Sequence, residues 1–499
     1  MDKFWKELQT GDIQFRDRWQ FELKSEFAAT SANPKSNHRQ EFYIFVPNSL
    51  LINSQTYTVN DFFKDQNNFI RFKTPRITLK ELLDESNENS PLTRFKKGLV
   101  EEKKFTYELK LLANIVRSEL RDEVHQLVDF LKDRKKPLDL ELFAKNVTQL
   151  CVEWKVFRQK FKETIISLDT TNGSNIAVTS AYVDEFLSGT FDFYFVGLLK
   201  YLRKLNDASL SACDALICEL LSDELKIRVK YFPLYANPQD PSARDEEIPY
   251  RQSLLNKFVM DVLHLVSNRD ALMNKHRNLI GSIAAGIAML VFLLLFVSQA
   301  SQFVVSSEPY IFLTVVFYIL KDRIKEGLRS IPSIRGFGWL ANYKTEIRSP
   351  DNSRLMGTLM ELFTFLDQKD ADPKIMEIRN KHFHTMLEKF QRPEKIIYYK
   401  KSVCMFTSLF AKYSRLNIIS RFNISQFFWK AGDPYFVYNV FDPETKKIVE
   451  IELPKTYHIN IILKNTYAEN DTTTKVTYQK FRLIVDKNGI KEVLQVNTN

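Results

Sequence analysis

The chain has 499 residues, of which 44% are hydrophobic and 13% aromatic, while glycine occurs only 13 times. This length is too great for one compact core, and the composition excludes a largely disordered or a collagenous chain. The formal net charge of +10 is unevenly distributed. Residues 1–250 carry 36 Lys and Arg against 38 Asp and Glu, residues 251–350 carry 12 against 6, and residues 351–499 carry 23 against 17. Because the basic excess lies in the second half, an anionic membrane surface is the expected partner and nucleic acid is not.

The first hundred residues mix short strand-like runs with one clear helix start. "EFYIFVP" and "NFIRFKTP" are aromatic and β-branched runs that end at proline, as strands often do. Thr78 and Glu81 have the spacing of a capping box at the start of "ITLKELLDE". Apolar residues then recur every three or four positions from about residue 99 to 230. We therefore predict a small α+β lobe over residues 1–98 and a helical bundle over residues 99–234.

A linker and a second kind of helix are expected next. Residues 235–250, "YANPQDPSARDEEIPY", concentrate Pro, Asp and Glu, which indicates a linker. Residues 251–277 are predicted to form an amphipathic helix that leads into a membrane. Its apolar stripe consists of Leu255, Phe258, Val259, Val262, Leu265 and Val266. Such a stripe would pair with a partner protein or a second copy of the chain, or would pack on the chain's own domains.

The most apolar part of the chain lies at residues 278–320. Residues 279–297 carry no charge, and as a helix they would extend about 28 Å, close to the ~30 Å hydrocarbon thickness of a bilayer. A second apolar run, residues 303–320, contains Glu308 and Pro309. These two runs predict a transmembrane hairpin with the lipid bilayer as partner. If Pro309 instead opens the second helix, only 12 residues remain before Lys321, and the second arm is then short or re-entrant.

Basic residues on both flanks predict how the hairpin is oriented. The residues before it are Arg251, Lys257, Arg269, Lys275 and Arg277, and those after it are Lys321, Arg323, Lys325, Arg329, Arg335, Lys344 and Arg348. The link "SQASQ" between the runs contains no basic residue. The positive-inside rule therefore places both flanks, and with them both termini, in the cytoplasm. For a bacterial source the membrane would be the inner, or plasma, membrane.

Small and acidic residues in the hairpin suggest how its helices pack. Gly281 and Ala285 are four residues apart, as are Ser282 and Gly286, a spacing that allows close approach of another helix. The other helix would be the second arm or the same helix of another copy. Glu308 is the one acidic residue between positions 278 and 320, and we expect it to cap a helix at the membrane interface.

The C-terminal half is predicted to change from helix to sheet. Residues 321–430 are interpreted as mostly helical, including an amphipathic helix in the aromatic and basic stretch after residue 397. A membrane-surface contact is the alternative for that stretch. Residues 431–499 predict a small antiparallel sheet of about five strands. Two of these strands flank "DPETKK", and two others flank "DKNG", a strong hairpin signal.

No motif points to a particular chemistry. Cys151, Cys213, Cys218 and Cys404 form no CxxC pair and are expected to be reduced thiols. The two histidines that are close in sequence, His382 and His384, would point apart on a helix. No metal site or cofactor, and no identifiable small-molecule ligand, is therefore expected. His125 and Asp129 are four apart and would meet on one helix face, where an ordinary solvated surface is the favoured interpretation.

The N-terminus lacks an apolar h-region, so no cleavable secretion signal is expected.

The combined prediction is an α+β, mostly helical integral membrane protein with a transmembrane hairpin between two cytoplasmic domains. The sequence predicts the membrane topology clearly and contains no catalytic motif. Together these observations favour a structural, scaffolding or regulatory role at the cytoplasmic membrane face. The alternative is a membrane-tethered enzyme whose site is made of dispersed residues. An oligomeric pore is less favoured, because only Glu308 would be ionisable between the two helices.

Overall fold

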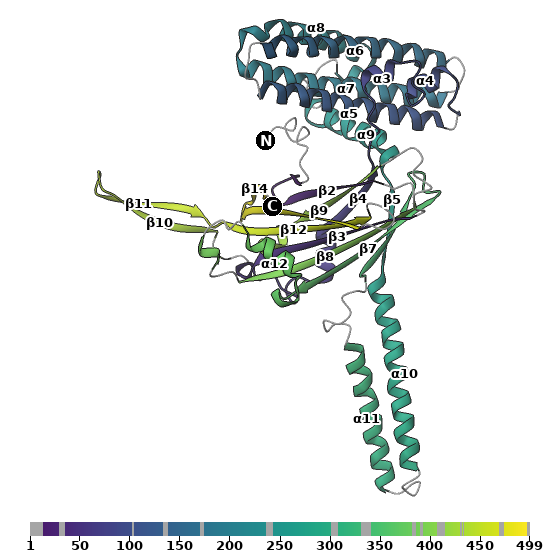
Figure 1. Ribbon diagram of the computed structural model, residues 1–499, viewed down its shortest axis with the longest axis vertical. Coiled ribbons are helices and arrows are strands. Elements are labelled where there is room, and N and C mark those ends of the chain that lie inside the picture. Colours follow the sequence, from purple (N-terminus) through teal and green to yellow (C-terminus); the bar gives the residue numbers. More distant parts are fainter. Residues whose placement is uncertain are drawn as a thin grey trace. The chain divides into compact units, whose positions relative to one another are not determined.

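Figure 1 shows a computed structural model of the chain, whose helices and strands belong to two compact units. Unit 1 comprises residues 1–14, 69–265 and 412–418, and unit 2 comprises residues 15–68, 266–411 and 419–499. The structure describes residues 13–28, 35–101, 104–132, 138–169, 174–235, 243–300, 308–330, 341–381, 386–389, 393–406, 415–429, 432, 434–468 and 474–496. Its combination of helices and strands confirms the α+β class.

Unit 1 is a bundle of long helices with an aromatic core. Its helices are α3 (Leu79–Leu83), α4 (Pro91–Lys96), α5 (Phe105–Lys132), α6 (Leu138–Asp169), α7 (Ser174–Leu205), α8 (Ser211–Tyr231) and α9 (Ile248–Met260). The ring of Trp154 on α6 stacks on Phe191 of α7 at 4.5 Å, and Phe191 stacks on Phe195 at 4.1 Å. The capping box predicted at α3 is confirmed, since Thr78 accepts from the Glu81 backbone N–H and Glu81 accepts from the Thr78 N–H.

The segment predicted as one helix over residues 251–277 is divided among the end of α9, a 3₁₀ turn (Asp261–Leu263), a strand and the start of the next α-helix, so that prediction is wrong. Helix α9 ends at Met260, and strand β5 (Val266–Ala271) follows before the next helix begins. The backbone of β5 is paired along its whole length with β6 (Tyr343–Arg348), and this distant partner overrides the local helical pattern. The α9 end of the stripe is buried within unit 1, where Asn114 of α5 donates to the Val259 carbonyl at 2.7 Å.

Unit 2 is built on β-sheets that pack face to face. The larger sheet has eight antiparallel strands in the order β14–β13–β12–β3–β8–β7–β6–β5. Those not yet given are β3 (Lys35–Pro47), β7 (Leu355–Leu366), β8 (Glu394–Phe406), β12 (Tyr457–Ala468), β13 (Thr474–Asp486) and β14 (Gly489–Val496). Unit 2 also contains residues 15–28, 66–68 and 419–423 of a four-stranded sheet, whose order is β1 (Ile13–Phe15), β2 (Gln20–Ala28), β9 (Arg415–Asn423) and β4 (Gln66–Phe72).

Aromatic side chains fill the space between the two sheets within unit 2. Phe42 of β3 lies 5.4 Å from Tyr399 of β8 and 5.6 Å from Phe422 of β9, measured between ring centroids. Phe422 in turn stacks on Phe21 of β2 at 5.2 Å. The opposite face of the larger sheet is covered by helix α12 (Pro373–Asn380) through an apolar cluster. The central strands are therefore buried on both faces.

Burial on both faces explains why residues 321–430 were wrongly predicted to be mostly helical. The region contains strands β6 to β9, and α12 is a short helix within it. Ile396 and Ile397 of β8 are neighbours in sequence, point to opposite faces and are both fully buried. A strand of this kind loses the alternation of apolar and polar residues that identifies a half-exposed strand.

The strands predicted in residues 431–499 are confirmed, but they do not form a separate sheet module. Strands β10 (Tyr435–Asp442) and β11 (Lys447–Pro454) pair with each other in a ribbon, and β12, β13 and β14 follow. Strand β12 pairs with β3 from the start of the chain, with Ile461 opposite Ile44. The predicted N-terminal lobe and C-terminal module thus share one sheet.

Two helices are inserted between neighbouring strands β5 and β6. These are α10 (Leu272–Ala300) and α11 (Glu308–Ser330), which contact each other and lie side by side in Figure 1. Many apolar side chains on their outer surfaces are exposed, and these are Leu279, Ile283, Ile287, Met289, Leu290, Leu293, Leu294, Val297, Ile311, Phe312, Val315, Val316, Ile319 and Leu320. No other part of the described chain covers this surface.

Candidate functional site

The base of the inserted helices is fixed by strand pairing. Ala271, the last residue of β5, pairs with Tyr343, the first residue of β6, and the Leu272 N–H donates to the Asn342 carbonyl at 2.9 Å. The chain therefore leaves the sheet and returns to it at adjacent positions. If the helices enter a membrane, everything on either side of residues 272–342 within unit 2 must remain on one side of that membrane.

Helix α10 is long and apolar enough to cross a bilayer. Its segment from Gly281 to Ser298 has a mean hydropathy of 2.4, and only 11% of it is buried. Eighteen helical residues extend about 27 Å, which nearly matches the hydrocarbon layer. A core helix of a soluble protein would be mostly covered, and this one is not.

A second membrane-spanning helix is not supported by the part of the chain that the structure describes. Residues 303–307 lie outside the described residues, and α11 begins at Glu308, with Pro309 at its second position. Only 12 residues then separate Glu308 from Lys321, about 18 Å of helix. The two-span prediction is corrected accordingly, and α11 is a short second arm whose C-terminal half is charged.

The two helices contact each other, and the most buried small side chains on α10 are not the ones named from the sequence. Ala284 and Ala288 on α10 are 2% and 1% exposed. The predicted packing residues Gly281 and Ala285 are half-buried, whereas Ser282 and Gly286 are exposed. Near the other end, the rings of Phe296 on α10 and Tyr310 on α11 lie 6.0 Å apart. Glu308 is exposed in the first turn of α11, where a negative charge complements the helix dipole.

A row of polar side chains crosses the interior of the sheets in unit 2. In the strand register, Glu361 of β7 lies opposite Lys401 of β8, Lys401 opposite Gln40 of β3, and Gln40 opposite Asn465 of β12. Glu361, Lys401 and Gln40 are at most 1% exposed. Four neighbouring strands therefore contribute to one layer of polar groups inside an otherwise apolar core.

The facing strands complete the hydrogen bonds of this row. Lys401 Nζ donates to Ser420 Oγ, and Ser420 Oγ donates to Asn68 Oδ1 at 3.0 Å. Gln40 Nε2 donates to Ser25 Oγ at 2.6 Å and to Asn465 Oδ1 at 2.8 Å. The row is thus satisfied largely by groups of the protein itself.

Glu361 is held at one end of the row by two hydrogen-bond donors and one ion pair. Its Oε1 accepts from the Tyr399 hydroxyl at 2.6 Å and from Asn68 Nδ2 at 2.7 Å. Its Oε2 lies 3.0 Å from Arg269 Nη2 on β5. The Arg269 guanidinium also lies 4.6 Å from the ring centroid of Phe63 and 4.5 Å from that of Tyr343. The negative charge of the buried Glu361 carboxylate is therefore balanced by these neighbours.

Lys401 has no such compensation in direct contact. Burial lowers the pKa of its ammonium to about 7, although the charge of Glu361 acts in the opposite direction. Its Nζ lies 4.9 Å from the ring centroid of Phe42. An amine that is half neutral near pH 7 has the acid–base properties of a catalytic lysine. Lys401 and Glu361 were not among the residues predicted from the sequence, because their segments were interpreted as helices and their inward positions on strands were therefore hidden.

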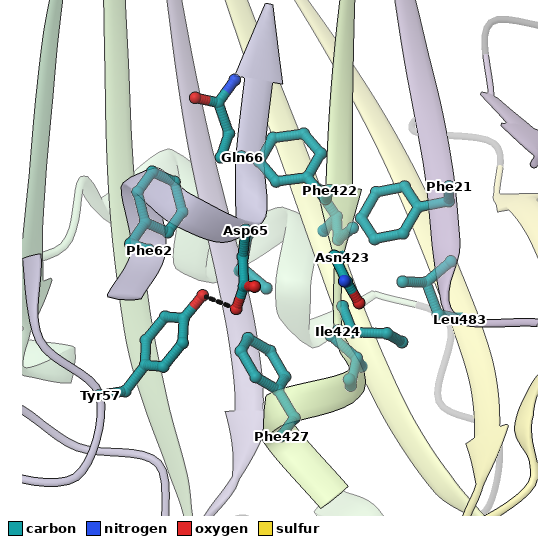
Figure 2. Close-up of a pocket in the computed structure, with 13 residues that line it drawn as sticks. Phe21, Tyr57, Phe62, Asp65, Gln66, Phe422, Asn423, Ile424, Phe427 and Leu483 are labelled. Atoms are coloured by element: carbon teal, nitrogen blue, oxygen red, sulfur yellow. Dashed lines mark hydrogen bonds between the residues drawn. The ribbon is translucent and has the colours of Figure 1, made fainter. Parts of the chain in front are cut away.

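A small cavity lies within unit 2, and Figure 2 shows its lining. The cavity measures about 20 Å³, room for about one water molecule, and is lined mainly by apolar side chains such as Phe62 and Phe422. Tyr57 donates to Asp65 Oδ2 at 2.9 Å, and burial raises the pKa of Asp65 to about 6. The space is too small for a substrate.

An open groove of about 830 Å³ lies beside the base of the β10–β11 ribbon. Arg379 and Glu394 line it, and Arg379 Nη2 donates to Glu394 Oε1 at 2.6 Å while its Nε donates to Oε2 at 3.2 Å. The bidentate pair neutralises both charges within the groove wall. The groove therefore has room for a partner segment, but Arg379 and Glu394 are already paired with each other.

Of the chemical candidates named from the sequence, His125 and Asp129 meet as expected on one face of α5. His125 Nδ1 lies 3.0 Å from Asp129 Oδ2 on the surface of α5, and Lys132 Nζ donates to the same carboxylate at 2.9 Å. The four cysteines are free thiols, of which Cys151 and Cys213 are buried. His382 and His384 lie outside the described residues. Among the residues that are described, no group of three His, Cys, Asp or Glu side chains is placed to hold a metal ion.

No protein-family model matches the chain, and comparisons with curated proteins and with solved structures give no match either.

Proposed function

We propose that this protein is attached to a membrane by α10 and α11 and that its role there is structural, scaffolding or regulatory. The observation that supports the proposal most directly is the uncovered apolar surface of α10 above a base closed by β5 and β6. Helix α10 would cross the hydrocarbon layer, and α11 would return beside it as a shorter arm. The sheets of unit 2 would then lie against one membrane face and present their surfaces to partners there.

Basic residues near the point where α10 and α11 leave the sheet support a cytoplasmic orientation. Fewer of them face a membrane than the sequence suggested. Arg251 is bound to Glu185 within unit 1, with Nη2–Oε2 at 2.7 Å, and Arg269 is paired with Glu361 inside the sheets. These two arginines do not face a membrane. Lys275, Arg277, Lys321, Arg323, Lys325 and Arg329 remain on the two arms. The positive-inside rule still favours the cytoplasm for the base of the arms.

Excision of the helices tests membrane attachment directly. Because Ala271 and Tyr343 are already paired, residues 272–342 can be replaced by Asn-Gly, which closes two antiparallel strands with a tight turn. The full chain should float with phosphatidylcholine vesicles containing 30% phosphatidylglycerol in a density gradient, and the excised chain should stay at the bottom. A circular dichroism spectrum that differs from that of the full chain only by the loss of the helical signal of α10 and α11 (29 and 23 residues), with a cooperative thermal transition, would show that the excised chain is folded. Equal flotation of both chains would overturn the proposal.

The orientation has its own test. Single cysteines at Ser54 and Ser425, in a chain without the four native cysteines, should react with an impermeant maleimide only after the cells are lysed. Both positions belong to unit 2. Reaction of either one in intact cells would place the sheets outside the cell and contradict the cytoplasmic orientation.

A membrane-tethered enzyme remains the second candidate, because Lys401, Glu361 and Tyr399 converge inside the sheets. Against it stands the small cavity of unit 2, which has room for about one water molecule and is not lined by any of these three side chains. Modification with an amine-reactive reagent at pH 8, with the modified lysines identified by mass spectrometry, distinguishes the enzyme from the structural role. A structural Lys401 should react only after unfolding, whereas a catalytic amine open to substrate should react in the native chain.

A further inference from the structure

The contacts between α10 and α11 define which residues lie at the same height along the pair. The Phe296 and Tyr310 rings are 6.0 Å apart, and Lys321 Nζ lies 5.9 Å from the Phe292 ring centroid. In an antiparallel pair, each step along one helix is matched by a step back along the other. Glu308 is therefore about level with Ser298, and Tyr318 is about level with Ala288.

This register puts the Lys321 ammonium well inside the apolar length of α10. Helical side chains tilt toward the N-terminus of their helix, so Lys321 extends back along α11, and its Nζ lies 3.8 Å from the Tyr318 ring centroid. Ala288 is seven residues from Gly281, where the apolar segment of α10 begins. The ammonium thus lies about 10 Å inside that segment, at 1.5 Å per residue.

Nothing in the described part of the chain fully compensates this charge. The Lys321 side chain is only 20% exposed, and its nearest carboxylate oxygen, Asp322 Oδ1, is 3.8 Å away on a side chain that is 54% exposed. A cation over an aromatic ring recovers part of the cost of burying an ammonium in lipid, but not all of it. The side chain also points away from the nearer membrane surface, so it does not reach water by extending.

Lys325 lies one helical turn closer to the base, on the same face of α11 as Lys321, and is exposed. Arg323, between them in sequence, is 79% exposed. The apolar run of α11 before Lys321 is shorter than the hydrocarbon layer, and such a mismatch is accommodated by local thinning, which brings headgroups inward. The positions of Lys321 and Lys325 suit one phosphate drawn into the leaflet beside the short arm.

We propose that Lys321 and Lys325 bind the phosphate of an anionic phospholipid from the leaflet next to the sheets. The proposal rests on membrane attachment through α10 and α11 and adds a lipid class and a binding site to it. Two ammonium groups, one of them desolvated, favour an anionic lipid over a zwitterionic one, because charge-assisted hydrogen bonds strengthen away from water. The site also explains how a lysine can be placed at this depth.

Native mass spectrometry of the full chain in detergent, titrated with phosphatidylglycerol or phosphatidylcholine, tests the proposal. The wild type should retain one phosphatidylglycerol at a concentration about tenfold lower than is needed for phosphatidylcholine. Lys321→Gln and Lys325→Gln should each lose that preference, whereas Lys321→Arg should keep it. Lys369→Gln, an exposed lysine of unit 2 far from α11 in sequence, is the matched control and should behave as wild type.

The outcomes separate this proposal from the membrane attachment on which it rests. Equal binding of both lipids by the wild type, or unchanged preference in Lys321→Gln, would overturn the lipid site. A dimer that is lost in Lys321→Gln would also overturn it, since the ammonium would then pair with a second copy. All variants should still float with vesicles of phosphatidylcholine alone. Failure of the wild type itself to float would refute the attachment.

Discussion

Lys401 is the ammonium group of the polar row, and it is buried without a carboxylate in hydrogen-bonding contact. Replacement of Lys401 by Met removes this charge. Met has similar length and no charge, and Ser420 keeps its hydrogen bond to Asn68 at 3.0 Å. In the folded chain the pKa of Lys401 is lowered from 10.5 to about 7 by burial. Between these two values the unfolded chain carries a proton that the folded chain does not. Stability of the wild type should therefore rise with pH across this window and be lowest below pH 7.

The size of the effect follows from the pKa difference. Each pH unit in the window contributes about 1.4 kcal/mol per proton, so the whole window, from pH 7 to pH 10.5, corresponds to about 5 kcal/mol. Between pH 7 and pH 9 the opening free energy of β8 should rise by about 2 kcal/mol more in the wild type than in Lys401→Met. At pH 6.5 Lys401→Met should be the more stable protein, because it avoids burying a charge.

Hydrogen exchange of β8 amides, followed by mass spectrometry and corrected for the intrinsic pH dependence of exchange, measures this opening free energy. Lys395→Met is the matched control, because Lys395 lies on the same strand with 45% of its side chain exposed. The control should follow the wild type at every pH. Parallel pH profiles for wild type and Lys401→Met would refute the reasoning, since the ammonium would then be charged in the folded chain or equally solvated in both states.

Two further predictions concern the same sheets. Burial raises the pKa of Asp65 from 3.8 to about 6, so the folded chain holds a proton that the unfolded chain releases, and stability should fall as pH rises from about 4 to 6. Asp65→Asn should flatten this part of the thermal unfolding profile, and a slope equal to that of the wild type would contradict the assignment. Gly357→Ala should destabilise unit 2 by about 1–3 kcal/mol in urea unfolding, because the new Cβ would lie 2.4 Å from the Cys404 carbonyl oxygen. Gly189→Ala, on α7 with nothing within 4 Å, should be neutral or stabilising, and similar losses in both variants would count against the packing argument.

Local patterns were sufficient wherever one element decides its own conformation. Thr78 and Glu81 lie within one helical turn, and their capping box was predictable from spacing alone. The β10–β11 and β13–β14 hairpins are closed by short turns with recognisable residues. The mean hydropathy of α10 likewise depends only on adjacent residues, so it identifies this apolar helix without knowledge of the rest of the fold.

The central strands were not predictable in the same way. Strands β7 and β8 are covered on both faces, so their sequences carry apolar residues at consecutive positions and resemble helices. With the strands misassigned, Lys401 and Glu361 could not be recognised as inward-facing neighbours. Their pairing joins residues 40 apart, and the pairing of Lys401 with Gln40 joins residues more than 350 apart.

By itself the sequence determined that this chain has an apolar helix suited to a membrane, with basic residues around it. It did so because hydrophobicity and charge are properties of adjacent residues. Tertiary structure alone decided that the helices return to the point where they leave, because this depends on β5 pairing with β6 across 71 intervening residues (272–342). It also decided the depth of Lys321 and the polar row inside the sheets. Both arise from register between distant segments, which packing sets and local sequence does not.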